Sequence, residues 1–237
     1  MLAAVLFDWG HTLMDWQWDE ELVGAGIRAG LEAVGAPPDA ADPVTQRYAA
    51  EAKLTDWEAP EEVEYESLVR TMLAECGVDV DDETLRAYLI AEHGAWAPAR
   101  RLASMSTALL DALRERGLKT GLVSNAMDPA WILLRDLEEQ ELLPRLDGVV
   151  FSSEVGVRKP RPEIFERALV ELDVSAERAL FVGDRLDADV RGARDVGMRT
   201  VQAMWFRAEE DARVEPDFQA FTQVDVLNIV RRLTGEL

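Results

Sequence analysis

The sequence is poor in lysine, histidine and cysteine. Only three of its 25 lysine and arginine residues are lysines, and only two residues are histidines, against 46 acidic residues. The resulting formal net charge of −21 argues against nucleic-acid binding, because that needs a basic face. No His/Cys cluster suggests a zinc site. The lysines therefore stand out individually: they are Lys53, Lys119 and Lys159.

Other absences narrow the class of protein further. A single cysteine, Cys76, excludes an internal disulfide and fits a reducing compartment. No apolar run approaches the length of a membrane span. The apolar start, Met1–Phe7, is too short and lacks the basic beginning of a signal peptide. We therefore expect a cytoplasmic protein without membrane partners, acting as a monomer or homodimer.

A long helical block occupies the first half of the chain. From about Asp19 to Trp96 the apolar residues recur at helical spacing, with no convincing strand. Glycines, prolines and acidic N-caps divide this block. The expected helices are Glu20–Val34, about Pro43–Leu54, Glu61–Glu75, and one from an Asp81-Asp82 cap to Gly94.

Outside this block, short apolar strands alternate with helices. The expected strands are residues 2–8, 119–123, 148–151, 179–182 and 200–203, and the helices are 107–116, 129–137, 162–172 and 188–196. Repeated β-then-α units predict an α/β fold with a doubly wound, Rossmann-like parallel sheet. The first strand belongs to this sheet, so the all-helical block interrupts it. We place the core at residues 1–15 and 99–237 and the helical insert at 16–98.

Polar residues follow four of the strands. In a doubly wound sheet these strand ends meet at one crevice. The ends carry Asp8, Ser124 with Asn125, Lys159, and Asp184 with Asp187 and Asp189. Singly, each has an ordinary interpretation: an aspartate as a helix N-cap, Ser-Asn as a turn, the lysine as a solvated loop residue and Asp187 as surface. Together they suit Mg²⁺ and a phosphate group, because Mg²⁺ prefers carboxylate and phosphate oxygens.

Four segments resemble the motifs of the haloacid dehalogenase-like (HAD) hydrolase superfamily, and they occur in the family's order. They are residues 7–13 (FDWGHTL), 122–125 (LVSN), 153–160 (SEVGVRKP) and 181–190 (FVGDRLDADV). The resemblance covers essentially the whole chain. It implies that the helical insert is the family's helical cap, of the subclass that closes over small substrates.

The resemblance also implies roles for the residues at the strand ends. Asp8 is then the nucleophile that forms an aspartyl-phosphate, which water hydrolyses. Ser124 and Lys159 hold the phosphoryl oxygens, Asn125 shapes that pocket, and the backbone near Trp9 and Gly10 contacts the transferring group. The implied Mg²⁺ ligands are Asp8, the backbone carbonyl of Gly10, Asp184 and, more remotely, Asp189, while Thr12 braces the loop.

Gly10 departs from the family's pattern. Phosphatases of the family usually have an aspartate two residues after the nucleophile, which protonates the leaving group and then activates water. Glycine can do neither, and general acid–base catalysis typically contributes about 10²–10⁴-fold, although glycine keeps its backbone carbonyl. Three explanations compete: a slow phosphatase that prefers good leaving groups, proton transfer by His11 instead, or a catalytically weak protein that acts by binding.

Two other reactions of the family are weighed. Its 2-haloacid dehalogenases also lack the second aspartate, but they act without metal, whereas Gly183-Asp184 keeps the metal-binding pattern here. Phosphonate hydrolysis uses a cap lysine, and Lys53 alone lies in this insert. The preferred prediction is a magnesium-dependent hydrolase of a small phosphorylated metabolite. The insert is expected to select the substrate, with hinges at residues 14–16 and 97–98 and tryptophans nearby at Trp16, Trp18, Trp57 and Trp96.

Overall fold

A parallel β-sheet forms the centre of the protein. The computed structural model of the chain describes residues 1–54, 56, 59–211 and 213–236. Its larger sheet has the strand order β5-β4-β1-β6-β7-β8, and neighbouring strands run parallel. The predicted α/β, Rossmann-like fold is therefore confirmed. The strands are β1 (Ala4–Phe7), β4 (Lys119–Ser124), β5 (Gly148–Phe151), β6 (Ala179–Gly183), β7 (Arg199–Ala203) and β8 (Phe218–Ala220).

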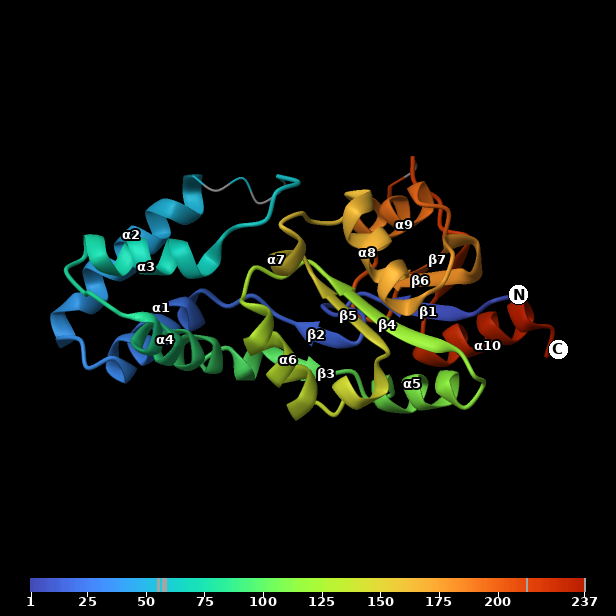
Figure 1. Cartoon of the computed structure of the whole chain (residues 1–237), viewed down its shortest axis with the longest axis horizontal. Coiled ribbons are helices and arrows are strands. Elements are labelled where there is room, and N and C mark those ends of the chain that lie inside the picture. Colours follow the sequence, from blue (N-terminus) through green and yellow to red (C-terminus); the bar gives the residue numbers. More distant parts are fainter. Residues whose placement is uncertain (55, 57–58, 212, 237) are drawn as a thin grey trace.

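Helices cover both faces of this sheet (Figure 1). Alternate side chains of β1 point to opposite faces, as a strand requires. Ala4 and Leu6 join the cluster under α8 and α9, and Val5 and Phe7 join the cluster under α5 and α10. The helices of this part are α5 (Ser106–Arg114), α6 (Ala130–Glu139), α7 (Ser152–Val155), α8 (Pro162–Leu172), α9 (Gly192–Asp195) and α10 (Gln223–Thr234).

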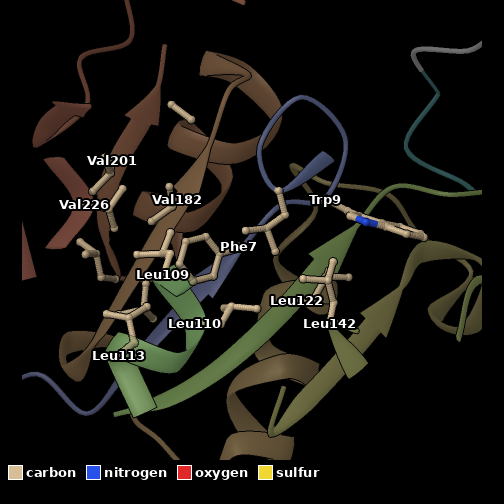
Figure 2. Packing of buried hydrophobic residues seen from close by; sticks show 14 of the residues in the cluster. Phe7, Trp9, Leu109, Leu110, Leu113, Leu122, Leu142, Val182, Val201 and Val226 are labelled. Atoms are coloured by element: carbon tan, nitrogen blue, oxygen red, sulfur yellow. The ribbon is translucent and has the colours of Figure 1, made fainter. Parts of the chain in front are cut away.

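The core beneath α5 and α10 is apolar and closely packed. Figure 2 shows Phe7 of β1 among Leu109, Leu110 and Val182, all with at most 1 % of their surface exposed. Burying a side chain of this size stabilises the fold by about 2 kcal/mol. This packing fixes the end of β1, and with it the position of Asp8, the next residue in the chain.

A separate group of helices lies beyond the carboxyl ends of the strands (Figure 1). It comprises α1 (Glu20–Ala33), α2 (Ala41–Leu54), α3 (Tyr65–Glu75) and α4 (Asp82–Gly94), with its own buried apolar cluster. As predicted, Asp81 caps α4, accepting a hydrogen bond from the Thr84 amide at 2.8 Å. Helices α1 and α4 approach closely at Gly30, where a Cβ would lie 2.6 Å from the ring of Tyr88.

Two short strands connect the helical group to the sheet. β2 (Met14–Trp16) pairs antiparallel with β3 (Arg100–Leu102). Neither was predicted, because strands of three residues are too short for their alternation to be recognised. The expected hinge at residues 14–16 is thus a paired strand. The other, at residues 97–98, lies in a 3₁₀ turn, Ala97–Ala99.

Other boundaries also differ from the predictions. Helix α3 begins at Tyr65 rather than Glu61, and the predicted helix 188–196 is a π-helical segment, Leu186–Arg191, followed by α9. No element was predicted after Ala203, although β8 and α10 complete the sheet and its apolar cover. Within the described residues, none of the helices has the length and apolar character needed to span a membrane.

Candidate active site

Asp8 lies at the topological switch point of the sheet, where strands added later in the chain continue on the opposite side of β1. From β1 the sheet continues through β4 and β5 on one side, and β6 to β8 lie on the other side. Ligands of such sheets bind outside the carboxyl ends of the strands at this point. Asp8 follows β1 and Asp184 follows β6, the neighbouring strand, so both carboxylates reach the same edge.

Lys159 joins the acidic groups at this edge. Its ammonium donates to Asp8 Oδ1 at 2.6 Å and to the Val123 carbonyl at 2.8 Å, and lies 2.8 Å from Asp189 Oδ1. All three charged side chains are buried. Burial opposes the ammonium charge, but Asp189 and Asp8 outweigh it and raise the pKa of Lys159. The lysine predicted as a site residue therefore lies in direct contact with the predicted nucleophile.

Asp8 itself carries an unfavourable charge in this environment. Burial raises its pKa to about 7, and the nearby carboxylates of Asp189 and Asp184 act in the same direction, while Lys159 opposes them. The raised pKa therefore reports mainly that the ionised carboxylate is removed from water, and to a lesser degree that two other carboxylates lie beside it. A divalent cation among the carboxylates would favour the ionised form of Asp8.

Asp184 and Asp189 complete an acidic cluster. Asp189 Oδ2 accepts a hydrogen bond from the Arg185 amide at 2.9 Å, and Asp184 is ion-paired with Arg207. Burial and the charge of Asp189 raise the pKa of Asp184 to about 6, against the opposing effects of Arg207 and Lys159. The Arg207 ion pair was not predicted, because it joins residues from separate loops.

The cluster has the composition of a site for a hard metal ion. Asp8, Asp184 and Asp189 each offer a carboxylate oxygen, and these oxygens lie within 4.8 Å of one another. Among the described residues, the buried atoms Asp184 Oδ2 and Asp189 Oδ1 have ion-pair partners, Arg207 and Lys159, but no hydrogen bond in good geometry. Oxygen ligands of this kind fit Mg²⁺. Gly10, the fourth predicted ligand through its carbonyl, lines the same pocket as Asp8.

The predicted phosphate-binding residues lie on the other side of Asp8. Ser124, at the end of β4, is buried and lines the pocket together with Asn125. The Asn125 amide donates to the Lys159 carbonyl at 3.1 Å and accepts from the Lys159 amide at 2.7 Å. Asn125 therefore holds the backbone of the loop that carries Lys159.

The loop after β1 is held by packing and by Trp205. The Trp9 ring is buried, packs on Phe151 at a centroid distance of 6.0 Å and donates to Gln140. Trp205 donates to the Thr12 carbonyl at 2.9 Å. Thr12 is fully buried, but its hydroxyl has no partner among the described residues, so its backbone, and not its hydroxyl, anchors the loop.

Positions 10 and 11 differ sharply in their surroundings. A Cβ added at Gly10 would meet no atom within 4 Å, so the position has room for a side chain. His11 adopts a left-handed backbone with φ of 56° and lies 3.6 Å from Asp15. Burial, aided by Arg207, lowers the pKa of His11. His11 is not among the residues that line the pocket over Asp8, which argues against the alternative that it transfers the proton in place of residue 10.

The pocket over Asp8 lies between the sheet and the helical group. Its volume is about 320 Å³, within the range of small-molecule sites. Charged residues that were not predicted as site residues also line it: Glu62, His93, Arg100, Asp128, Asp136 and Arg158. All of them except Arg158, which belongs to the family segment 153–160, lie outside the four motifs, so no local pattern indicated them. The expected surface position of Asp187 agrees with its side chain, which is 57 % exposed and paired with Arg191.

One segment of the helical group reaches across to the sheet domain. We call residues 59–62 the strap. The Glu62 amide donates to the Gly156 carbonyl at 3.0 Å, and the Arg158 amide donates to the Pro60 carbonyl at 2.8 Å. The Glu62 carboxylate accepts a hydrogen bond from Ser152 and lies 3.7 Å from Arg158. The strap therefore closes one side of the pocket with both backbone and charged contacts.

Comparison with known proteins identifies the family. A profile of the family described as haloacid dehalogenase-like hydrolase matches residues 2–197. The chain belongs to this family of hydrolases. A HAD relative, glyceraldehyde 3-phosphate phosphatase of Methanopyrus kandleri, is 32% identical over the full length of both chains. The family resemblance, and with it the prediction of a HAD-like hydrolase, is confirmed.

Solved HAD structures share the fold of this member. A HAD phosphatase from Thermococcus onnurineus has a TM-score of 0.64 at 24% identity, covering 97% of this chain and 98% of its own. A 2-haloacid dehalogenase from Pseudomonas syringae has a TM-score of 0.69 at 21% identity, covering 98% and 100%. At these identities the likeness concerns the fold, so it does not choose between the two reactions.

The tryptophans expected near the helical insert are partly placed. Trp57 lies outside the described residues. Trp16 and Trp18 line the pocket over Asp8. Trp96 packs against both, with ring centroids 5.2 Å from Trp16 and 5.1 Å from Trp18. These three indoles belong to the two connections between the sheet and the helical group.

Proposed function

We propose that this HAD hydrolase is a magnesium-dependent phosphatase of small phosphorylated metabolites, with Asp8 as its nucleophile. The observation that carries the proposal is the buried contact of 2.6 Å between Asp8 and Lys159 within a cluster of three carboxylates. The full-length likeness to a phosphatase at 32% identity supports the same reaction. The pocket volume of about 320 Å³ suits a small substrate.

Each residue has a chemical task in this reaction. Asp8 attacks the phosphorus atom and the ester oxygen leaves with its bonding electrons, giving an aspartyl-phosphate. Lys159 keeps the Asp8 carboxylate in place and, with Ser124, stabilises charge on the phosphoryl oxygens. Water then attacks the phosphorus and restores Asp8. Backbone N–H groups near Trp9 and Gly10 contact the transferring group.

Mg²⁺ would be held by Asp8, Asp184 and the Gly10 carbonyl, with Asp189 supporting it. When bound, it would neutralise carboxylate and phosphoryl oxygens and so let the two anions approach. Asp184 would have to exchange its ion pair with Arg207, at least in part, for a bond to the ion. The sequence-based choice of Mg²⁺ rests on this all-oxygen set of ligands.

We also propose that the helical group is the cap of this enzyme. Residues 16–98 would form the cap and residues 1–15 and 99–237 the catalytic core. The support is the location of α1–α4 beyond the strand ends and the strap contacts at the pocket (Figure 1). In this arrangement the helical group selects substrates and excludes water from Asp8.

The experiment is phosphate release from acetyl phosphate and 4-nitrophenyl phosphate, with Mg²⁺ and with EDTA. We expect release with Mg²⁺ only, and its loss by at least about 10³-fold in Asp8→Asn. Asp187→Asn is a matched control, because Asp187 is exposed and paired with Arg191. Wild-type activity in Asp8→Asn would overturn the assignment of the nucleophile.

The same assay separates the alternatives weighed from the sequence. A 2-haloacid dehalogenase would release halide without metal and leave phosphate esters intact. A protein that acts by binding would bind Mg²⁺ without hydrolysing any of these compounds. Either result would replace the proposed function, since the phosphatase requires turnover that depends on both Mg²⁺ and Asp8.

A further inference from the structure

Three indole rings are among the residues that line the pocket over Asp8. They belong to Trp9, Trp16 and Trp18. Trp9 is occupied by its packing on Phe151 and is only 3 % exposed. Trp18, by contrast, is 60 % exposed although it is the largest apolar side chain that a protein can carry. A tryptophan left open at the rim of a pocket indicates a binding surface more than a packing residue.

Trp16 and Trp18, which we call the indole wall, both pack against a third tryptophan, Trp96. Trp96 stacks on Trp16 with an interplanar angle of 26° and contacts Trp18 at 40°. Trp96 lines the neighbouring cavity but is not among the residues lining the pocket over Asp8. The ring of Trp96 therefore props Trp16 and Trp18 in place, and these two rings meet whatever occupies the pocket.

The charged residues of the pocket are already paired with one another. His93 lies 2.7 Å from Asp136, and Arg100 is ion-paired with Asp136 and donates to the His93 carbonyl at 3.0 Å. Because these charges are compensated within the pocket, the leaving group of the substrate does not need a charge of its own to pair with them. The indole wall is then the feature that favours a particular kind of leaving group, a flat and apolar one.

Gly10 restricts the leaving group independently. With no acid at this position, residue 10 cannot protonate the departing oxygen. A phenol loses its proton near pH 10, as tyrosine does, whereas water, and an alkyl alcohol like it, does so only at about 16. A phenolic oxygen therefore needs the missing acid far less than an alkyl oxygen does.

We propose that the substrate class is aryl phosphate monoesters, whose flat ring lies against Trp16 and Trp18. This inference rests on the proposed function. Asp8 forms a bond to phosphorus as the bond from phosphorus to the aryl oxygen breaks, and the aryl oxygen takes the electron pair. The aryloxide gains a proton from solvent, and water hydrolyses the aspartyl-phosphate to inorganic phosphate and free Asp8.

The test compares 1-naphthyl phosphate, glycerol 3-phosphate and acetyl phosphate in wild type and Trp18→Ala. Acetyl phosphate has a good leaving group but no ring. In wild type we expect kcat/KM for naphthyl phosphate to exceed that for glycerol 3-phosphate by at least about 10²-fold. Trp18→Ala should lower kcat/KM for naphthyl phosphate about tenfold more than for acetyl phosphate. Trp18→Phe, which keeps a ring, should restore most of this difference.

Phe221→Ala is the matched control. Phe221 is 63 % exposed, like Trp18, but it lines a different cavity, beside Met105 and Trp205. We expect wild-type kinetics from this variant. A second readout is the affinity of Asp8→Asn for 1-naphthyl phosphate, measured by the quenching of tryptophan fluorescence. Adding Trp18→Ala to this variant should weaken the affinity about tenfold.

The possible failures are distinguishable. If acetyl phosphate is not hydrolysed either, the proposed phosphatase function fails. If acetyl phosphate is hydrolysed through Asp8 but Trp18→Ala affects both substrates equally, the inference about the ring is overturned alone. A preference for glycerol 3-phosphate or for nucleoside monophosphates over naphthyl phosphate would overturn it as well, because those are alkyl esters.

Discussion

A buried ammonium holds the acidic residues of this site together. Lys159 lies 2.6 Å from Asp8 and 2.8 Å from Asp189, so the ammonium compensates the charge of both carboxylates and they compensate its charge. Removing one partner of such a buried group typically costs about 3–5 kcal/mol. The site therefore behaves as a unit, and single substitutions in it are expected to act on stability as well as on catalysis.

Gly10→Asp tests the missing acid at the level of one residue. A side chain fits, since a Cβ at this position meets no atom within 4 Å and the φ of Gly10 is not positive. We expect kcat for glycerol 3-phosphate to rise by at least about tenfold, because a general acid–base typically contributes 10²–10⁴-fold. Acetyl phosphate, with its good leaving group, should gain much less. A folded variant without any gain on glycerol 3-phosphate would contradict this account of Gly10.

Gly183→Ala tests the close packing behind Asp189, one of the proposed metal ligands. A Cβ at position 183 would lie 2.5 Å from the carboxylate of Asp189, so the carboxylate must move. We expect the concentration of Mg²⁺ at half-maximal activity to rise at least about tenfold, as measured by titration of phosphate release.

Gly94→Ala serves as the control for that change. Gly94 is the last residue of α4, and a Cβ there meets no atom within 4 Å. The unfolding free energy of the Gly94→Ala variant should differ from that of wild type by no more than about 1 kcal/mol. Its activity should depend on Mg²⁺ as the wild-type activity does. Equal Mg²⁺ dependence in both variants would mean that Asp189 does not support the metal.

At the level of elements, the junction of α4 with α6 contains two titratable groups with displaced pKa values. Burial disfavours the charged form of His93, but its hydrogen bonds to Asp128 and Asp136 outweigh this effect and raise its pKa to about 9. Glu92 is buried, and burial together with Asp128 raises its pKa to about 8. Both groups bind protons more tightly in the folded chain than in the unfolded one, where their pKa values are 6.5 and 4.5.

The sign of the pH dependence follows from these shifts. Between pH 4.5 and about 8 for Glu92, and between 6.5 and about 9 for His93, the folded state holds the extra proton. The unfolding free energy must therefore fall as pH rises through both windows, with His93 accounting for about 3 kcal/mol. Urea unfolding at about pH 6 and about pH 9.5 measures the fall. His93→Gln and Glu92→Gln should each reduce it, and a stability that rises with pH would contradict the assignment.

Prediction from the sequence succeeded where one local pattern decides the structure. Apolar strands ending in Asp8, Ser124 and Asp184 gave both the parallel sheet and the edge where the site lies. Strands of three residues, such as β2, β3 and β8, are too short to show the alternation of apolar and polar residues by which a strand is predicted. The ion pair of Arg207 with Asp184 and the network of His93 with Asp136 join distant segments, so nothing in the neighbouring sequence announces them.

At the scale of the whole molecule, the strap is one of the contacts that join the proposed cap to the core, beside the junction of α4 with α6. Glu62 bonds to Ser152 and lies near Arg158, and its side chain is only 3 % exposed. The two backbone hydrogen bonds of the strap, at 3.0 and 2.8 Å, add to these contacts. This arrangement resists separation of the two parts while the pocket is closed.

Glu62→Ala is expected to favour the open arrangement. Loss of a hydrogen bond to a charged group costs about 1.5–3 kcal/mol, so KM for acetyl phosphate should rise about tenfold while kcat changes little. Glu66→Ala, an exposed acidic residue of α3, is the control and should keep the wild-type KM. An unchanged KM in Glu62→Ala would mean that the strap does not contribute to substrate binding.

The central claim is that Asp8 carries the phosphoryl group during turnover. Its most direct test is rapid acid quenching of the enzyme with Mg²⁺ and [³²P]acetyl phosphate, followed by mapping of the labelled peptide. The account predicts a hydroxylamine-sensitive label on the peptide that contains Asp8, and none in Asp8→Asn. Release of phosphate at the wild-type rate by Asp8→Asn, with no labelled enzyme at any time, would contradict it.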